Sequence, residues 1–207
     1  MSFLKSISQK YDMSVMLALS IVYFNQGFKV FLDLAILDYF KSYLQLEPTM
    51  VQYISSIVVL PWTLKIVYGL IADNFPLFGS RRRNYIVLNG CLQFLTLFVL
   101  SFDLFSSPLF ITVMLFFNAL SSAFVDVVVD ALMVTQSRVD PDHGSDELQG
   151  LSWCMLSIGG IIGSLLSAMY TSQLHPRYAF LTCSLIGLIM IAVGLNMDIA
   201  IEEGHTR

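Results

Sequence analysis

The chain is poor in charged residues. Asp, Glu, Lys and Arg make up 13% of its 207 residues, whereas a soluble domain usually carries about 25%. Because 56% of the residues are hydrophobic, we expect lipid rather than water to surround most of the protein. The net charge is only −4, and no basic stripe with interleaved aromatic residues is present. This composition argues against a nucleic-acid partner.

Cysteine and histidine are scarce as well. The three cysteines lie in apolar runs at unrelated spacings, which favours small core residues over a disulfide or a metal site. His143, His175 and His205 are scattered, with no metal-ligand spacing and no activated nucleophile beside them. We therefore expect no metal site, no cofactor and no enzymatic activity.

Two sequence features that would help to identify the compartment are not found. The sequence contains no Asn-x-Ser/Thr acceptor for glycosylation. The first apolar run is too long for the core of a cleavable signal peptide and contains Lys29, so we expect it to be a retained span. These observations leave the identity of the membrane open.

Long hydrophobic runs divide the chain into six expected membrane spans. Each is near the length of about 20 residues that a bilayer requires. Pro61 falls inside the second span, where a proline should kink the helix. The sequence thus predicts an all-α membrane protein, a single six-helix unit over residues 1–207 with tails 1–12 and 198–207. The expected spans are 13–43, 48–74, 84–103, 108–137, 147–172 and 176–197.

Basic residues fall mainly on one side of the expected membrane. Seven of them lie in the two tails and in the second and fourth loops, and only two, Lys41 and Arg177, lie in the opposite loops. By the positive-inside rule, both termini should face the cytoplasm or the matrix or stroma of an organelle.

The fourth span repeats a pattern of the first. Phe24-Asn25 is followed by Asp33 at the spacing that separates Phe117-Asn118 from Asp126. Three spans are thus followed by three similar spans. Because each unit has an odd number of spans, the second unit is inverted in the membrane relative to the first. The sequence therefore predicts two inverted three-helix units, 13–103 and 104–197, which is the nested repeat found within transporter halves.

Five charged residues lie at membrane depth: Lys29, Asp33, Lys65, Asp126 and Asp130. An acid there costs about 2.5–3.5 kcal/mol on insertion scales, so such residues usually have a function. Residues four apart share a helix face, and Lys65 should lie at the depth of Asp130. We expect Lys65 to pair with Asp130 or Asp126. The pattern favours a solute- or ion-binding site of a transporter. The alternative is that the charges neutralise one another only to hold helices together.

A second cluster follows the second span, where Gly69 and Asp73 precede Arg81, Arg82 and Arg83. Glycine permits close helix approach, and Asp73 could pair with an arginine or cap a neighbouring helix. We interpret the cluster as a gate, although the arginines alone could serve only to orient the protein.

The stretch from Gly159 to Ser164 carries small residues that recur at four-residue spacing. Such residues let two helices touch backbone to backbone, so we expect packing within the bundle.

Several strings are more specific than hydrophobic patterning. They are residues 39–41, 61–73, 81–85, 126–131, 148–153 and 163–164.

The pattern from Gly69 to Arg83 resembles the loop motif of the major facilitator superfamily. The whole set resembles the folate–biopterin transporter family of plants and protists. The resemblance implies a cavity lined by the first and fourth helices, with Lys65, Asp126 and Asp130 at motif positions. It also implies folate- or pterin-like solutes and proton coupling.

The chain departs from this family at three points. Ile66 replaces a usual proline, and Thr135 stands where a glutamate is usual. The family fold has about twelve spans, and the resemblance covers the first six. The chain is therefore a fragment, a half that pairs with a second half or with itself, or a transport-inactive accessory subunit of a larger membrane complex.

Overall fold

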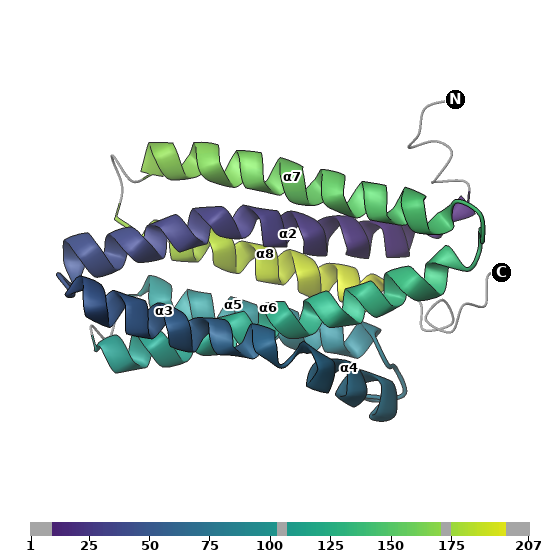
Figure 1. The fold of residues 1–207 in the computed structure, drawn as a ribbon, viewed down its shortest axis with the longest axis horizontal. Helices are drawn as coiled ribbons and strands as arrows, with labels where there is room; N and C mark the ends of the chain where they lie inside the picture. The colour runs from purple at the N-terminus through teal and green to yellow at the C-terminus, as the bar shows by residue number, and fades with distance from the viewer. Residues whose placement is uncertain (1–9, 103–106, 171–174, 198–207) are drawn as a thin grey trace.

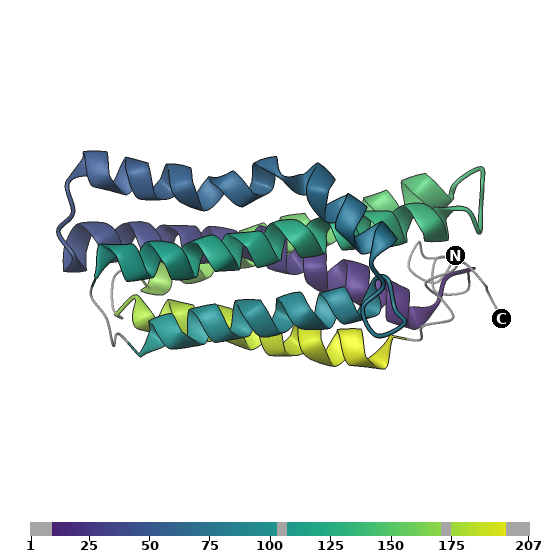
Figure 2. The same ribbon diagram turned by 90° about the horizontal axis from the view of Figure 1, so that it is seen from below.

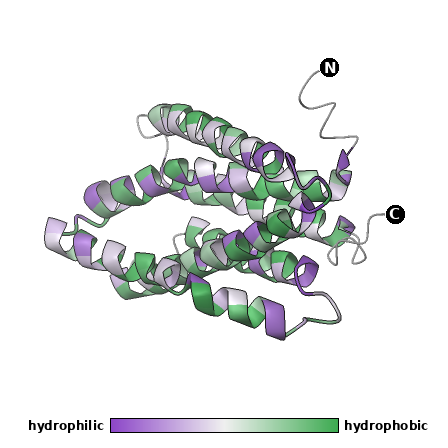
Figure 3. Ribbon diagram, turned by 45° about the vertical axis from the view of Figure 1, so that its right-hand side comes forward, coloured by the Kyte–Doolittle hydropathy of each residue, from purple (hydrophilic) through white to green (hydrophobic). Residues whose placement is uncertain are grey.

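The computed structural model describes residues 10–102, 107–170 and 175–197, and these are helical with short connections. Six segments of this part are long and apolar enough to cross a membrane. Figure 3 shows apolar residues over most of each helix, with hydrophilic residues at several helix ends. The helices are α2 (Met13–Asp38), continued by a π-helical turn (Tyr39–Tyr43), α3 (Pro48–Thr63), α4 (Lys65–Asn74), α5 (Arg83–Ser101), α6 (Pro108–Ser137), α7 (Gly144–Tyr170) and α8 (Arg177–Asn196).

The predicted spans are confirmed with small shifts at their ends. Three have the predicted bounds, and the third, fifth and sixth begin one residue earlier, three earlier and one later than predicted. The predicted ends at residues 103 and 172, and most of both tails, lie outside the described residues.

The second span is divided into two helices. Pro61 lacks the N–H that would bond the preceding turn, and three residues later Leu64 leaves helical geometry with φ −96° and ψ 13°. The amide of Leu64 donates to the carbonyl of Pro61 at 3.2 Å, which closes α3 with a tight turn. The predicted kink is confirmed. Lys65 therefore becomes the first residue of a separate helix, α4.

The helix pairs follow the symmetry of two inverted units. The first span, α2, packs mainly on the fifth, α7, and the equivalent pair is formed by α6 with the second span, α3 and α4. The third and sixth spans, α5 and α8, pack on each other, as do α2 and α6. Figures 1 and 2 show α2 beside α7 and α5 beside α8 along the length of the bundle.

The two equivalent interfaces are packed differently. A Cβ at Gly27 of α2 would lie 1.9 Å from the carbonyl oxygen of Leu156 on α7, and one at Gly159 would lie 2.2 Å from that of Phe24. The α2 and α7 backbones are thus in direct contact, which is the packing predicted for the glycine-rich stretch. The second span is the least buried of the six, followed by the fifth.

One end of the bundle gathers the segments predicted to lie on the cytoplasmic side. The start of α2, the loops 75–82 and 138–143, and the end of α8 lie together at the right in Figure 1. Lys10 forms ion pairs there with Asp140 at 2.8 Å and with Glu147 at 2.7 Å, joining the N-terminal segment to the second unit. The Lys10 ammonium lowers the pKa of the Asp140 carboxyl by hydrogen bonding.

The apolar core consists of two clusters. On α2, one cluster includes buried residues up to Val22, and the other begins at Phe28. Between them lie Asn25 and the half-buried Gln26. The middle of the bundle is therefore polar, and it is there that the candidate site is found.

Candidate functional site

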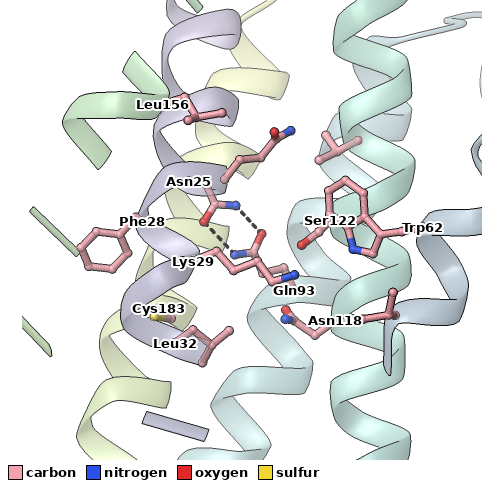
Figure 4. Close-up of a pocket in the computed structure, with 13 residues that line it drawn as sticks. Asn25, Phe28, Lys29, Leu32, Trp62, Gln93, Asn118, Ser122, Leu156 and Cys183 are labelled. Atoms are coloured by element: carbon pink, nitrogen blue, oxygen red, sulfur yellow. Dashed lines mark hydrogen bonds between the residues drawn. The ribbon is translucent and has the colours of Figure 1, made fainter. Parts of the chain in front are cut away.

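A pair of buried amides joins α2 to α5 in the middle of the bundle. Asn25 Nδ2 donates to Gln93 Oε1 at 3.0 Å, and Gln93 Nε2 donates back to Asn25 Oδ1 at 3.1 Å. Each side chain satisfies the other, so this pair fixes the two helices at the level of the site (Figure 4).

An ion pair joins α4 to α6 at the same level. Lys65 Nζ donates to Asp126 Oδ2, and Gln26 Nε2 of α2 donates to the other oxygen of the same carboxylate. The Asp126 side chain is 7% exposed, whereas the Lys65 side chain is 39% exposed. The predicted pairing of Lys65 is confirmed, with Asp126 as its partner. Three helices meet at this one carboxylate.

Asp130 lies on the same face of α6 as Asp126 but has a different partner. Its carboxylate accepts a hydrogen bond from the Tyr23 hydroxyl of α2. Asp126 and Asp130 both point toward α2, as their four-residue spacing predicts. Tyr23 and Gln26 were missed by the sequence interpretation, because neutral partners produce no charge pattern to search for.

Trp62 brings two cations together. The amines of Lys29 and Lys65 lie 5.2 Å and 4.7 Å from the centre of its ring. Each cation is attracted to the indole face. Lys29 and Asp33 form no ion pair among the described residues, although both line one cavity with α3. Lys29 is therefore a cation held by a neutral aromatic ring.

The central cavity has a volume of about 400 Å³. It is bounded by α2, α3, α5 and α6, with contributions from α7 and α8, and Figure 4 shows its lining. Lys29 provides its charge, and Asn25, Gln26, Gln93, Asn118 and Ser122 provide its neutral polar groups. Such a mixture of apolar walls and a few polar groups is typical of sites for small organic molecules.

Two polar atoms of this lining have no hydrogen-bond partner in the described chain, although they are buried: Asn118 Oδ1 and Trp62 Nε1. The sequence hinted at Asn118 through the repeated Phe-Asn pair, and at Trp62 through its place beside Pro61. Neither was assigned to the site.

The predicted gate residues are divided in the structure. Gly69 faces Val127 of α6, and a Cβ there would meet its side chain at 3.5 Å, an ordinary contact. Asp73 is exposed and makes no hydrogen bond or ion pair within the described residues, so neither of its two expected roles, pairing with an arginine or capping a helix, is seen there. Arg83 donates to the carbonyl of Leu195 at 3.0 Å and so caps the end of α8.

The positions that depart from the family pattern take no part in the ion pair, although Ile66 directly follows Lys65. Ile66 is 81% exposed, and the Thr135 hydroxyl donates to the Ala131 carbonyl of its own helix at 2.9 Å. Among the described residues, no group of three metal-ligating side chains comes together.

Comparison with known proteins gives a consistent set of relatives. The profile of the BT1 family matches residues 26–205. The chain is 31% identical to the "Probable folate-biopterin transporter 4" of Arabidopsis thaliana over 191 residues, which is 91% of the chain and 39% of that relative. It is 32% identical to the "Folate-biopterin transporter" of Synechocystis sp. (strain ATCC 27184 / PCC 6803 / Kazusa) over 193 residues, 93% of the chain and again 39% of the relative.

A more distant relative is the "Folate transporter 1" of Plasmodium falciparum (isolate 3D7), 27% identical over 84% of the chain and 35% of the relative. The chain thus spans about two fifths of the length of the curated relatives that it matches. A multi-pass bundle of apolar helices, with charges clustered at its centre, accompanies a family match over most of the sequence. The chain is an integral membrane protein and belongs to the BT1 family.

Proposed function

We propose that the chain forms part of a secondary transporter for a folate- or pterin-like solute, coupled to protons. The names of the relatives support the solute class. The observation that carries the proposal is the central charge cluster, in which Lys65 is paired and Lys29 has no carboxylate partner within the described residues. A charge at membrane depth that is not neutralised by the protein is available to a charged solute.

The two lysines would contact the anionic part of the solute. Both amines lie over the ring of Trp62, and Lys29 borders two cavities, one of which it shares with Asp33. An anion bound near Lys29 would weaken the hold of Lys65 on Asp126, because it offers a second negative partner. Solute binding would in this way be coupled to the central ion pair.

Asp126 and Asp130 are the proposed proton-binding groups. Asp126 bridges α2, α4 and α6 through Gln26 and Lys65, and Asp130 joins α6 to α2 through Tyr23. Protonation removes the charge that holds these contacts, so it would loosen α4 and α2 from α6 together. A proton would thereby change helix packing at the same site that binds the solute.

The cluster of Gly69, Asp73, Arg81, Arg82 and Arg83 is the proposed gate, on the cytoplasmic side or on the matrix or stroma side of an organelle. Asp73 is exposed at the end of α4 and unpaired within the described chain. It is therefore available to a charge or helix end outside this bundle.

A second six-helix unit, or a second copy of this chain, is the proposed partner. The second and fifth spans are the least buried of the six. They are the spans that inverted symmetry exchanges, and they expose large apolar side chains such as Val59, Leu60, Trp153 and Leu165. A partner bundle contacting both would enclose the central cavity.

The direct test is uptake of labelled folate by proteoliposomes that contain the purified chain, with and without a pH gradient. We expect Lys65→Ala and Asp126→Asn to abolish uptake, and Lys41→Ala, which alters an exposed lysine without an ion pair in the described chain, to retain it. Uptake by Lys65→Ala and Asp126→Asn at the parent rate would overturn the roles proposed for these two residues. Absence of uptake together with stable association with unrelated subunits would favour an accessory subunit instead.

A further inference from the structure

The central cavity contains a neutral recognition surface in addition to its charges. Asn118 on α6 is 4% exposed, and its Oδ1 has no hydrogen-bond partner within the described residues. Trp62 on α3 has a buried Nε1 with no partner there. Both residues line the same cavity of about 400 Å³ (Figure 4).

We propose that Asn118 and Trp62 form hydrogen bonds to the edge of a flat nitrogen heterocycle that carries a lactam, a ring N–H beside a C=O. This proposal rests on the proposed function. Asn118 Oδ1 accepts a hydrogen bond from the ring N–H. Trp62 Nε1 donates to a ring acceptor such as the carbonyl oxygen. The charged part of the solute is left to the lysines.

Unpartnered polar atoms are unusual in a protein interior, because an atom removed from water without a new hydrogen bond loses free energy. In lipid the loss is greater, since no water is available beside the helices. The same bundle shows that its amides can be satisfied when their role is structural, because Asn25 and Gln93 bond each other twice. Among the residues of this lining, Asn118 Oδ1 and Trp62 Nε1 are the buried polar atoms that have no partner within the described chain.

The chemistry of the two groups selects the ligand class. An indole N–H only donates, and the oxygen of an amide only accepts. A ligand that satisfies both must offer a donor and an acceptor, as the N–H and C=O of a lactam do. Replacing the ligand carbonyl by an amino group turns an acceptor into a donor, and replacing the N–H by a bare ring nitrogen turns a donor into an acceptor. Asn118 Oδ1 would then face an acceptor and Trp62 Nε1 a donor. Such mismatches are rejected strongly in sites built on hydrogen bonds.

The rest of the lining suits a flat ring. Phe28, Leu32, Val59, Val125 and Leu156 provide apolar walls around the polar groups. The volume falls within the range of about 300–1,000 Å³ that small-molecule sites occupy. Lys29 borders the same cavity, so its ammonium group is the cation available to a carboxylate on a ring bound there.

The test compares two ligands of equal charge, pterin-6-carboxylate and 2,4-diaminopteridine-6-carboxylate. They differ in the lactam alone. Binding is measured by titration of the purified chain in lipid nanodiscs. We expect the wild-type protein to prefer the lactam at least tenfold. Asn118→Leu and Trp62→Phe should each reduce this preference severalfold, with little effect on the diamino compound. Asn74→Leu is the matched control, because Asn74 lies outside the cavity and its amide bonds the Leu70 carbonyl of its own helix.

Thermal unfolding provides a second readout. Because Asn118 Oδ1 has no partner within the described chain, Asn118→Leu should leave the melting temperature unchanged or raise it. A large fall in melting temperature would show a structural role and overturn the proposal. It would also be overturned if the wild-type protein binds pterin-6-carboxylate and neither variant changes the preference. In that case the proposed transport function would stand. Failure of the wild-type protein to bind either compound would instead overturn both this proposal and the proposed transport function.

Discussion

Lys65, the first residue of α4, forms an ion pair with Asp126 of α6 directly after the break in the second span. The break and the ion pair therefore occupy the same point of the bundle. A helix that is interrupted at Leu64 can reorient its second segment with little loss of backbone hydrogen bonding. The ion pair holds the start of that segment on α6, and the stacked rings of Tyr68 and Phe124 hold it one turn further along.

Lys65→Met should lower the free energy of unfolding by about 2 kcal/mol. This is less than the 3–5 kcal/mol typical of a fully buried pair, because Lys65 is partly exposed. The loss arises because the Asp126 carboxylate is left buried without a cation. Combining Lys65→Met with Asp126→Asn should recover most of it, since the stranded charge is then removed. Thermal unfolding in detergent measures both. Equal losses in the single and double variants would contradict this account, and Lys41→Met is the control.

Gly159→Ala should destabilise the bundle, whereas Gly160→Ala should not. A Cβ at Gly159 would lie 2.2 Å from the Phe24 carbonyl oxygen, so α2 and α7 would have to separate. The nearest atom to a Cβ at Gly160 is 3.8 Å away. Overpacking of this kind costs about 1–3 kcal/mol. Comparing the melting temperatures of the two variants tests this prediction, since both carry the same substitution at adjacent positions. Similar values would refute direct backbone contact between α2 and α7.

The cluster of Lys10, Asp140 and Glu147 should make stability depend on pH. Hydrogen bonds to the two carboxylates raise the pKa of Lys10, and the Lys10 ammonium lowers the pKa of Asp140. A lowered carboxyl pKa stabilises the fold above the ordinary aspartate value, and the contribution is lost as pH falls through the lowered value. A raised lysine pKa stabilises it below the ordinary lysine value, and the contribution is lost as pH rises through the raised value.

Lys10→Met should therefore lower the melting temperature slightly between roughly pH 5 and pH 10. The difference from wild type should shrink at lower pH, and also in high salt, because these groups are exposed. Melting curves recorded across pH and salt test this directly. A difference that persists unchanged at acid pH would exclude the ion pairs as its cause.

Arg83→Gln should loosen the end of α8. The Arg83 guanidinium donates to the Leu195 carbonyl, one of the groups that a helix end leaves without an intrahelical partner. Amide hydrogen exchange should rise in the last turn of α8 and change little at its start. Arg138→Gln removes an equal charge from another loop at the same end of the bundle and serves as the control. Unchanged exchange in α8 would show that this contact does not hold the helix end.

Apolar periodicity and proline positions were sufficient to predict the spans and the kink after Pro61, because bilayer thickness and the missing proline N–H act locally. The pairing of Lys65 with an acid on the fourth span was also predictable, since an isolated charge in lipid is costly. Choosing Asp126 over Asp130 was not possible, because that choice depends on Tyr23 occupying Asp130 and on Gln26 reaching Asp126. Neither neutral side chain reveals its partner in the sequence.

The cavity lining was the least predictable part of the site. Asn118 and Trp62 are single polar groups in apolar helices, and whether such a group finds a partner is decided by helices far apart in the sequence. The arginines after α4 show the same limit. Their spacing suggests one shared gate, whereas Arg83 binds the end of α8.

The tight packing of α2 on α7 has a consequence for how the protein is made. The ribosome releases α2 into the membrane long before α7 exists, so the first helix, with Lys29 and Asp33, must wait in lipid without its main neighbour. Neither Gln26 nor Tyr23 can reach its aspartate until α6 has entered the membrane. The first three spans are thus an unfinished assembly during synthesis. Asn25 and Gln93 can already bond each other at that stage, whereas Gln26 and Tyr23 gain their aspartate partners only when the fourth span arrives.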